Sequence, residues 1–453
     1  MIEEYSEITP YIRELADLSD ANNGITNEMY ALHDVKRGLR DVDGRGVVTG
    51  LTEVSAVNGR RTLPNGEEEY IEGELRYRGV DVRDLVRGYI ADNRHGFEEA
   101  AYLLLFSKLP TSAELDKFKA VLSSYRTLPQ SFVRDMVLKA PGKDMMNMLS
   151  RTVLALYAYD QNPDDISTAN VLRQGLMLLA RFPLLAVYGY QAHQHYNNYQ
   201  SLFIHYPKPE YDTAENLLYL LRENGEFTPL EAKLLDLALV LHAEHGGGNN
   251  STFTTRVVTS SGADTYSAVA AALGSLKGPR HGGANLKVVQ MFDDLKANVN
   301  TKSDAEIEKY LHRLLAKDAF DRAGLIYGIG HAIYSKSDPR AEILRSFAQK
   351  LSEEKGMQEE FELYEKVAKL APQIITEKRK MYKGVSPNVD FYSGLVYRML
   401  GLPLELFTPI FAVSRIAGWT AHRIEELQSA GKIIRPAYIN VGKDKPYTEL
   451  KKR

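Results

Sequence analysis

The chain contains no cysteine among its 453 residues. This absence excludes disulfide bonds, thiolate metal sites and catalysis by a cysteine nucleophile. It is typical of a protein in the reducing cytoplasm, which is the compartment we expect. The chain also has no large excess of positive or negative charge, since the formal net charge is only -3. No overall electrostatic attraction to nucleic acid or to an anionic membrane is therefore predicted.

Long hydrophobic runs are scarce. The most apolar stretch, residues 176–190, is interrupted by Arg181 and Pro183 and is shorter than the roughly 20 residues of a membrane span. We expect a buried helix there, bent or broken near Pro183. The first twenty residues are acidic and hold no basic segment followed by an apolar run, so no secretory signal is expected.

Helical periodicity dominates the rest of the chain. Apolar residues recur at i, i+3 and i+4 in many segments, whereas the alternation typical of strands is local. Two helix starts are marked by capping residues, at Thr111 with Glu114 and at Thr228 before Pro229. The sequence predicts an all-α fold with a few short strands near the N- and C-termini. The clearest helical segments are 97–109, 146–160, 231–242 and 408–427, and the strand-like segments are 46–57 and 435–442.

Four segments punctuated by glycine or proline hold ionisable side chains that suit chemistry. Taken singly, each histidine is equally well explained as a satisfied core or surface group. His242 lies on the apolar face of its helix and is interpreted as structural, as are His205, His312 and His422. The candidates in the four segments are His245, His281, His331 with Arg340, and Asp390. Two further candidates, Arg415 and Arg435, lie closer to the C-terminus.

Metal and phosphate sites are not predicted. His242 and His245 are three residues apart and do not form the HExxH pattern, and no carboxylate completes a ligand set. The glycines at 246–248 lack the following Gly-Lys-Ser/Thr of a phosphate-binding loop.

Arg415 is surrounded in sequence by apolar residues. Buried arginine is rare unless it is paired, so either an internal carboxylate or a ligand carboxylate is expected beside it. Arginines bind planar carboxylates, histidines polarise carbonyls, and one carboxylate removes a proton from carbon. This combination suits carbon–carbon bond formation between an enolisable thioester and a small dicarboxylic keto acid.

The order of these motifs resembles the citrate synthase family, and its longer bacterial members most of all. The resemblance implies an all-α fold in two domains, a large one at 1–285 and 394–453 and a small one at 286–393 that closes over CoA. It also implies a homodimer. The segments that carry the resemblance are 70–86, 97–111, 241–258, 274–285, 328–344, 387–394 and 411–427.

The resemblance implies a role for each catalytic residue. His281 would hydrogen-bond the thioester carbonyl of acetyl-CoA and stabilise its enol. Asp390 would remove the methyl proton, and His331 would bind and protonate the carbonyl of oxaloacetate. The remaining residues would bind oxaloacetate, with Arg435 reaching the partner subunit's site: His245, Arg340, Arg415 and Arg435.

CoA binding is implied at the small domain. The adenine would contact backbone between Ile326 and Ala332, including Gly328. Many members carry a basic residue four positions after the second catalytic histidine, where this chain has Ser335. Lys336 follows and is the candidate for the contact with CoA phosphates.

The activity implied is that of an acyltransferase that condenses acetyl-CoA, oxaloacetate and water to citrate and CoA, the entry step of the tricarboxylic acid cycle. No cofactor and no metal are expected. A 2-methylcitrate synthase using propionyl-CoA stays open, because one methylene changes discrimination by only about 1–3 kcal/mol. A non-catalytic relative that binds CoA or a dicarboxylate is the other alternative, and the presence of His281, His331 and Asp390 argues against it.

Overall fold

The computed structural model describes residues 6–41, 45–379, 384–429 and 431–453. The chain forms two compact units. One comprises Leu51–Ile434, and the other comprises Met1–Gly50 with Arg435–Arg453. The division into domains 1–285 with 394–453 and 286–393 stays a prediction, because the structure groups 51–434 together.

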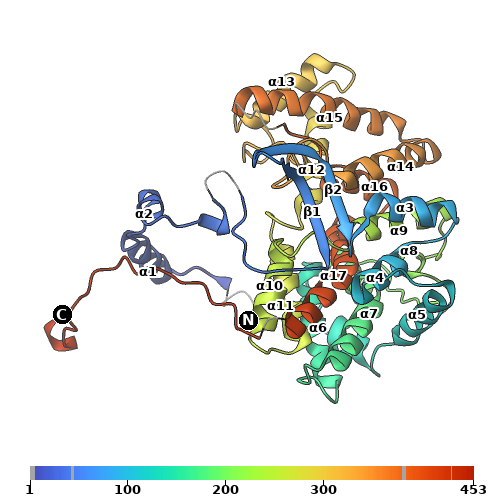
Figure 1. Cartoon of the computed structure of the whole chain (residues 1–453), viewed down its shortest axis with the longest axis horizontal. Coiled ribbons are helices and arrows are strands. Elements are labelled where there is room, and N and C mark those ends of the chain that lie inside the picture. The colour runs from blue at the N-terminus through green and yellow to red at the C-terminus, as the bar shows by residue number, and fades with distance from the viewer. Residues whose placement is uncertain (1–5, 42–44, 380–383, 430) are drawn as a thin grey trace. The chain divides into compact units, whose positions relative to one another are not determined.

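The Leu51–Ile434 unit is built almost wholly of helices, as the periodicity predicts (Figure 1). Helix α17 is its centre: it packs on α4, α7, α9, α10 and α11, and most of its side chains are buried. Its helices are α3 (Val82–Ala91), α4 (Phe97–Phe106), α5 (Ser112–Tyr125), α6 (Met145–Leu156), α7 (Thr168–Asn198), α8 (Thr213–Leu221), α9 (Pro229–His242), α10 (Asn250–Ser260), α11 (Thr265–Lys277), α12 (Ala284–Asn298), α13 (Asp304–Leu315), α14 (Pro339–Lys355), α15 (Gln358–Arg379), α16 (Val389–Met399) and α17 (Phe407–Ser429).

Capping chemistry places two helix starts where the sequence predicts them. Thr111 caps α5 and forms a reciprocal capping box with Glu114. Thr228 does the same for α9 with Glu231, and Pro229 occupies the first turn. These ends are set by local hydrogen bonds, so they can be read from sequence.

The expected buried helix is confirmed, and it does not break at Pro183. Helix α7 is continuous from Thr168 to Asn198 with Pro183 buried inside it. Packing of α7 against α6, α8 and α17 compensates for the backbone hydrogen bond that proline removes. Among the described residues α7 alone is long and apolar enough to cross a membrane, and 78% of its apolar window is buried inside the protein.

The strands do not lie at the residues where the sequence predicts them. β1 (Ser55–Thr62), β2 (Glu68–Tyr77) and β3 (Val80–Asp81) form one antiparallel sheet in that order. β1 shares only its first three residues with the segment 46–57, and 435–442 contains no strand. Alternation alone did not suffice at 435–442, because a strand needs a hydrogen-bonded partner.

The β1–β2 hairpin supports the loop that follows α13. A side chain at Gly59 would clash with the carbonyl oxygen of Ile333, and one at Gly73 with that of Ser337. The Gly73 N–H donates to Ser337 Oγ over 3.2 Å. The two glycines therefore let the hairpin backbone pack directly on residues 333–339.

The second unit holds α1 (Pro10–Ala21) and α2 (Asn27–Leu32), neither of which has a buried residue. Tyr11, Leu18 and Leu32 are more than half exposed. So are Tyr438 and Tyr447 in its C-terminal segment. Several apolar side chains of this unit are therefore exposed.

Candidate active site

A loop carries His331 and the first turn of α16 carries Asp390, and hydrogen bonds join the two segments. The Asn388 N–H donates to the Gly328 carbonyl over 2.9 Å, and its side-chain amide donates to the Gly330 carbonyl over 2.7 Å. Gly328 has a φ of +80°, and a Cβ there would lie 2.9 Å from the Cα of Phe391. Glycine is therefore required for this approach of the two segments.

Asp390 lies in the first turn of α16, at the helix start that the sequence predicts. Its Oδ1 is buried and has no hydrogen-bond partner among the described residues. Burial raises the pKa of Asp390 to about 6, and Asp338 adds to this, while Arg340 and Arg415 oppose it. A carboxylate held in this way is a stronger base than one in water.

His281 lies in the turn between α11 and α12. Its Nε2 is 3.3 Å from the backbone nitrogen of Ser251 and 2.9 Å from Ser251 Oγ. Burial, with Arg415 as a second cause, lowers the pKa of His281 to about 4. The ring is therefore neutral near pH 7, and because Nε2 accepts from a backbone N–H, the proton is on Nδ1.

His331 and His245 form a second pair. The Nδ1 of His331 accepts from the backbone N–H groups of Ile333 and Tyr334, over 3.1 and 3.2 Å. The N–H of that ring in its neutral form is therefore Nε2–H. His245 is buried with its ring centroid 5.1 Å from that of His331, and its Nε2 is 3.2 Å from Tyr334 Oη. Burial holds the pKa of His245 well below its usual value, with Arg340 next in effect.

The two buried arginines of the cluster have different partners. Arg340 forms a two-point ion pair with Asp338, at 3.0 and 2.8 Å. Arg415 is 1% exposed, donates from Nε to the His242 carbonyl over 2.7 Å, and has no carboxylate within 4 Å among the described residues. Burial lowers the pKa of Arg415 to about 10. Glu244 is the carboxylate with the largest effect on the pKa of Arg415 but makes no direct ion pair with it among the described residues, so the expected ligand carboxylate stays a prediction.

The charge of Arg415 acts on three other candidates, His245, His281 and Asp390. The structure therefore brings six predicted site residues from six separate segments into one cluster, in which three are buried and three are half-buried. They are His245, His281, His331, Arg340, Asp390 and Arg415.

Arg435 is exposed and begins the C-terminal part of the other unit. Its assignment to a partner's site stays a prediction. Of the candidates for CoA, Ile326 is buried, whereas Ala332 and Lys336 are exposed beside His331. Lys336 also lines a cavity of about 310 Å³.

Sequence reasoning missed the residues that hold the candidates in place. Asp338 caps α14, binds Arg340 and accepts the Val389 N–H over 3.1 Å, so one carboxylate joins the starts of α14 and α16. Its position before a proline at a helix start is a signal that could have found it. Ser251 beside His281 and Tyr334 between the other two histidines gave no comparable signal.

His422, interpreted from sequence as a packing or surface residue, is fully buried. Its Nε2 is 2.9 Å from Glu244 Oε1, and its Nδ1 is 2.7 Å from a terminal nitrogen of Arg256. Ser55 Oγ also donates to Glu244, over 2.9 Å. This network joins α10, α17 and β1 directly behind His245.

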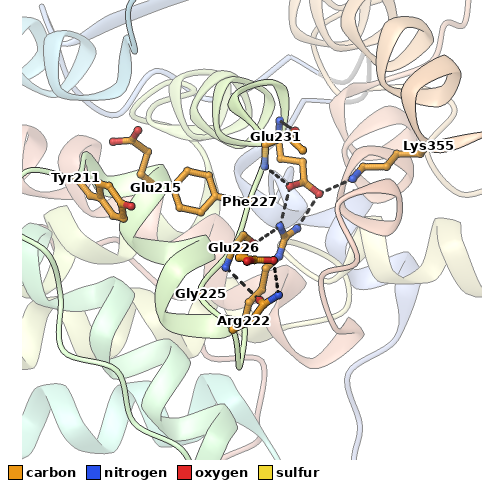
Figure 2. Close-up of a pocket in the computed structure, with 10 residues that line it drawn as sticks. Tyr211, Glu215, Arg222, Gly225, Glu226, Phe227, Glu231 and Lys355 are labelled. Atoms are coloured by element: carbon orange, nitrogen blue, oxygen red, sulfur yellow. Dashed lines mark hydrogen bonds and ion pairs between the residues drawn. The ribbon is translucent and has the colours of Figure 1, made fainter.

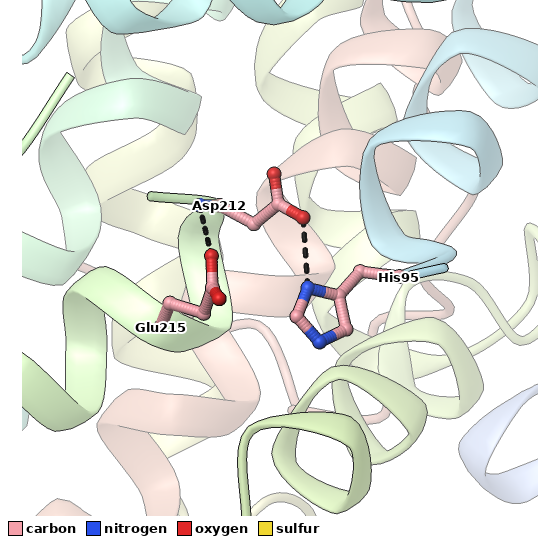
Figure 3. A group of neighbouring side chains, drawn as sticks. All are labelled: His95, Asp212 and Glu215. Atoms are coloured by element: carbon pink, nitrogen blue, oxygen red, sulfur yellow. Dashed lines mark hydrogen bonds and ion pairs between the residues drawn. The ribbon is translucent and has the colours of Figure 1, made fainter. Parts of the chain in front are cut away.

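One cluster in the described part of the chain has metal-ligand residue types, His95, Asp212 and Glu215 (Figure 3). His95 Nδ1 is 2.8 Å from Asp212 Oδ2, and Lys119 Nζ is 3.2 Å from the other oxygen. Burial opposes the charged ring, but the Asp212 hydrogen bond and nearby carboxylates raise the pKa of His95 to about 9. An imidazolium does not ligate a metal, so we interpret the cluster as an ion-pair network.

A surface cavity of about 850 Å³ is lined mainly by residues 211–231, which include part of the segment 197–229 to which the sequence assigns no role (Figure 2). None of the predicted site residues lines it. At its wall Glu231 accepts two hydrogen bonds from Arg222, at 2.7 and 2.9 Å, and one from Lys355 at 2.6 Å. Glu231 thus ties the start of α9 to the end of α14.

Replacing Glu231 by glutamine is expected to lower the free energy of unfolding by about 2–3 kcal/mol at pH 7, because it removes the buried carboxylate that pairs with the partly exposed Arg222 and Lys355. Burial opposes ionisation, but Arg222, Lys355 and the Thr228 N–H together hold the pKa of Glu231 at about 2, below its ordinary 4.5. The difference between wild type and variant should therefore be complete above pH 4.5 and shrink as the pH falls toward 2. Urea unfolding at several pH values measures it. Glu226→Gln, at an exposed neighbour, is the matched control, and equal midpoints for all three proteins would contradict the assignment.

Comparison with known proteins places this geometry in a family. The family model described as "Citrate synthase, C-terminal domain" matches residues 39–437. A citrate synthase of Synechocystis is 36% identical over 87% of this chain and 90% of its own length. A 2-methylcitrate synthase of Shewanella oneidensis is 34% identical over 81% of this chain and 88% of its own.

Solved structures of citrate synthases also align with this chain over most of its length. Citrate synthase of Thermoplasma acidophilum, in a ternary complex with carboxymethyl coenzyme A and oxaloacetate, aligns with a TM-score of 0.76 at 28% identity, over 92% of this chain and 99% of that one. Citrate synthase of Pyrobaculum aerophilum aligns with a TM-score of 0.74 at 28% identity, over 92% and 95%. The chain therefore belongs to the citrate synthase family and is an acyltransferase with that family's all-α fold.

Proposed function

We propose that the enzyme condenses acetyl-CoA with oxaloacetate and water to form citrate and CoA. The observation that carries this proposal is the buried Arg415, which has no direct carboxylate partner among the described residues and lies near the neutral His245 and His281 and near Asp390. A dianionic keto acid supplies the missing partner, and the neutral rings and the carboxylate supply the chemistry of enolisation.

Oxaloacetate binds first to the positive groups. A carboxylate of the substrate pairs with the free guanidinium nitrogens of Arg415, and Arg340, held in orientation by Asp338, faces it from α14. His331 donates Nε2–H to the keto oxygen, because its Nδ1 is already occupied by two backbone donors. His245 completes the pocket as a neutral donor. The keto carbon is thereby made electrophilic.

Enolisation follows at the thioester. Asp390 takes a proton from the methyl carbon while His281 donates Nδ1–H to the thioester oxygen. A carboxylate is a weak base toward such a carbon, so stabilising the developing oxyanion at the same moment is essential. The enol carbon attacks the keto carbon, His331 protonates the new alkoxide, and water hydrolyses the citryl thioester to citrate and CoA.

The acid side of the pH profile should report Asp390. Only its carboxylate form removes a proton, and the raised pKa of about 6 places its titration well above that of an ordinary aspartate. We expect kcat/KM to fall about tenfold per pH unit below pH 6, because His281, with a pKa of about 4, stays neutral there. Steady-state rates from pH 4.5 to 8 measure this. A profile that is flat down to pH 5 would contradict the role of Asp390.

Closure of residues 286–393 over CoA is part of the proposal. Ile326, Gly328 and Ala332 belong to the loop that contains His331. Adenine bound to the backbone of this loop would therefore bring the thioester of CoA toward the cluster. Lys336 is exposed, has no ion-pair partner among the described residues, and suits a CoA phosphate.

A homodimer completes the proposed enzyme. The uncovered apolar side chains of α1 and of the C-terminal segment support it, because monomers rarely leave so many exposed. Arg435, at the start of that segment, is assigned to the partner's site, where it would pair with a substrate carboxylate. We place this enzyme in the cytoplasm, at the entry of the tricarboxylic acid cycle, and its chemistry requires neither a metal nor a cofactor.

A second candidate is the 2-methylcitrate reaction with propionyl-CoA, favoured by the 34% identity to a 2-methylcitrate synthase. Measuring kcat/KM for both acyl-CoA substrates with oxaloacetate, with the product identified by mass spectrometry, separates the two. We expect acetyl-CoA to be preferred. A higher kcat/KM for propionyl-CoA would assign the chain to the second reaction.

A further inference from the structure

One hydroxyl group binds both sequence neighbours of His245. Ser55, the half-buried first residue of β1, donates from Oγ to Glu244 Oε1 over 2.9 Å. The same Oγ accepts the backbone N–H of Gly246 over 3.1 Å. The residue before His245 and the residue after it are therefore both fastened to β1.

The direction of both hydrogen bonds follows from the groups involved. The Gly246 N–H can only donate, so Ser55 Oγ accepts from it and has one proton to give. Burial opposes ionisation of Glu244, but His422 and then Arg415 hold its pKa at about 2, below the ordinary 4.5. The carboxylate is therefore charged, and it accepts the hydroxyl proton in a charge-assisted hydrogen bond.

Glu244 is a rigid point of attachment. Its Oε1 also lies 2.9 Å from His422 Nε2, and a side chain at Gly418 would clash with its other oxygen. Its backbone carbonyl accepts the hydroxyl of Tyr77 over 3.2 Å. Both ends of this residue are thus held by other elements, so the backbone that leads into His245 is fixed.

The residue after His245 depends on Ser55 more directly. Gly246 has a φ of +87°, and a Cβ there would lie 3.1 Å from a methyl carbon of Val57, so this turn packs closely on β1. The Ser55 hydroxyl is the acceptor of the Gly246 N–H. Without the hydroxyl that N–H would lose its acceptor, and the turn would be free to shift together with the backbone of His245.

The ring of His245 is sensitive to such a shift. Its Nε2 is 3.2 Å from Tyr334 Oη, and its ring stands edge-on to that of His331, with the centroids 5.1 Å apart. Hydrogen bonds weaken steeply when their geometry changes. A displaced backbone would therefore weaken the contacts of this ring with the loop of His331 and with a bound substrate.

We propose that Ser55 is a positioning residue that fixes the backbone on both sides of His245 and so holds its ring in place within the cluster. The inference rests on the proposed function for the identity of the ligand, since His245 is there assigned to oxaloacetate. The fastening of residues 244–246 is itself a property of the free enzyme.

The experiment compares Ser55→Ala with wild type by the dissociation constant for oxaloacetate, measured by calorimetry. We expect this constant to rise about fivefold to tenfold, the equivalent of one lost hydrogen bond. With saturating oxaloacetate, kcat should stay within about twofold of wild type, because His281 and Asp390 are untouched. Ser55→Thr keeps the hydroxyl and should restore the wild-type affinity.

Asn58→Ala is the matched control on the same strand, because Asn58 is exposed, and it should bind oxaloacetate as wild type does. In a His245→Ala background, Ser55→Ala should cause no further loss of affinity, because the hydroxyl acts through that ring. Hydrogen exchange of residues 243–249, followed by mass spectrometry without ligand, should be faster in Ser55→Ala and unchanged in Asn58→Ala.

Exchange of this segment that is as slow in Ser55→Ala as in wild type would overturn the proposal, as would losses of affinity that add in the double variant. Faster exchange in an enzyme that binds no oxaloacetate would instead support the fastening of His245 by Ser55 and contradict the proposed function. The two failures are therefore distinguishable.

Discussion

The Asp390→Asn enzyme is expected to lose about a hundredfold or more in kcat, the range of general base catalysis. Asparagine keeps the shape of the side chain at the start of α16 and removes the base. The buried Oδ1 of Asp390 has no hydrogen-bond partner among the described residues, so the substitution should break no hydrogen bond of that atom. The loss should therefore appear in the chemical step and not in folding.

Two measurements separate the lost base from other effects. The dissociation constant for oxaloacetate should stay within about twofold of wild type, because neither Arg340 nor Arg415 is altered. Asp293→Asn, at a half-exposed carboxylate that pairs with Arg398, should retain nearly full turnover as the matched control. Near wild-type turnover by Asp390→Asn would remove Asp390 from the mechanism.

Mixing two inactive proteins is expected to restore activity if each site uses two chains. In a dimer of an Arg435→Ala subunit with an Asp390→Asn subunit, one site holds both lesions and the other holds neither. Free exchange at equal concentrations should then recover about a quarter of the wild-type rate per chain. Because each variant is inactive alone, this gain in activity is large and is specific to the mixed dimer.

Several controls make the mixing result decisive. Each variant must first be folded and inactive alone, and mass spectrometry must show that subunits have exchanged. A mixture of Arg435→Ala with a chain carrying both substitutions should stay inactive. Exchanged dimers that remain as inactive as their parents would mean that Arg435 acts within its own chain or not at all.

Local chemistry made parts of the fold predictable from sequence. Thr111 and Thr228 mark helix starts because a capping hydrogen bond involves only neighbouring residues. At Pro183 the sequence could not decide whether the helix breaks, because that depends on how tightly other helices pack around α7. Of the hairpin at 55–77 only the first three residues were predicted as strand, and Gly59 and Gly73, which would weaken a strand in isolation, serve a contact with residues 333–339 that lie far away in sequence.

At the site, too, some residues could be predicted from the sequence and others depend on contacts that form only on folding. His281, His331 and Asp390 could be named from their glycine- and proline-rich segments and from the order of the family's motifs. Asp338 and Ser251 could not, because their roles lie in contacts with Arg340 and His281 that only folding creates. The raised pKa of Asp390 could likewise not be predicted from the sequence, because burial in the folded protein is its main cause.

The central claim is that this cluster joins the methyl carbon of the acetyl group of acetyl-CoA to the keto carbon of oxaloacetate. The most direct measurement mixes the enzyme with acetyl-CoA, with and without oxaloacetate, and follows free thiol and citrate together. Thiol release that requires oxaloacetate, with one citrate formed for each CoA released and with loss of both in Asp390→Asn, is the predicted result. Thiol release at the same rate without oxaloacetate, or without citrate or a homologue of it among the products, would contradict the account.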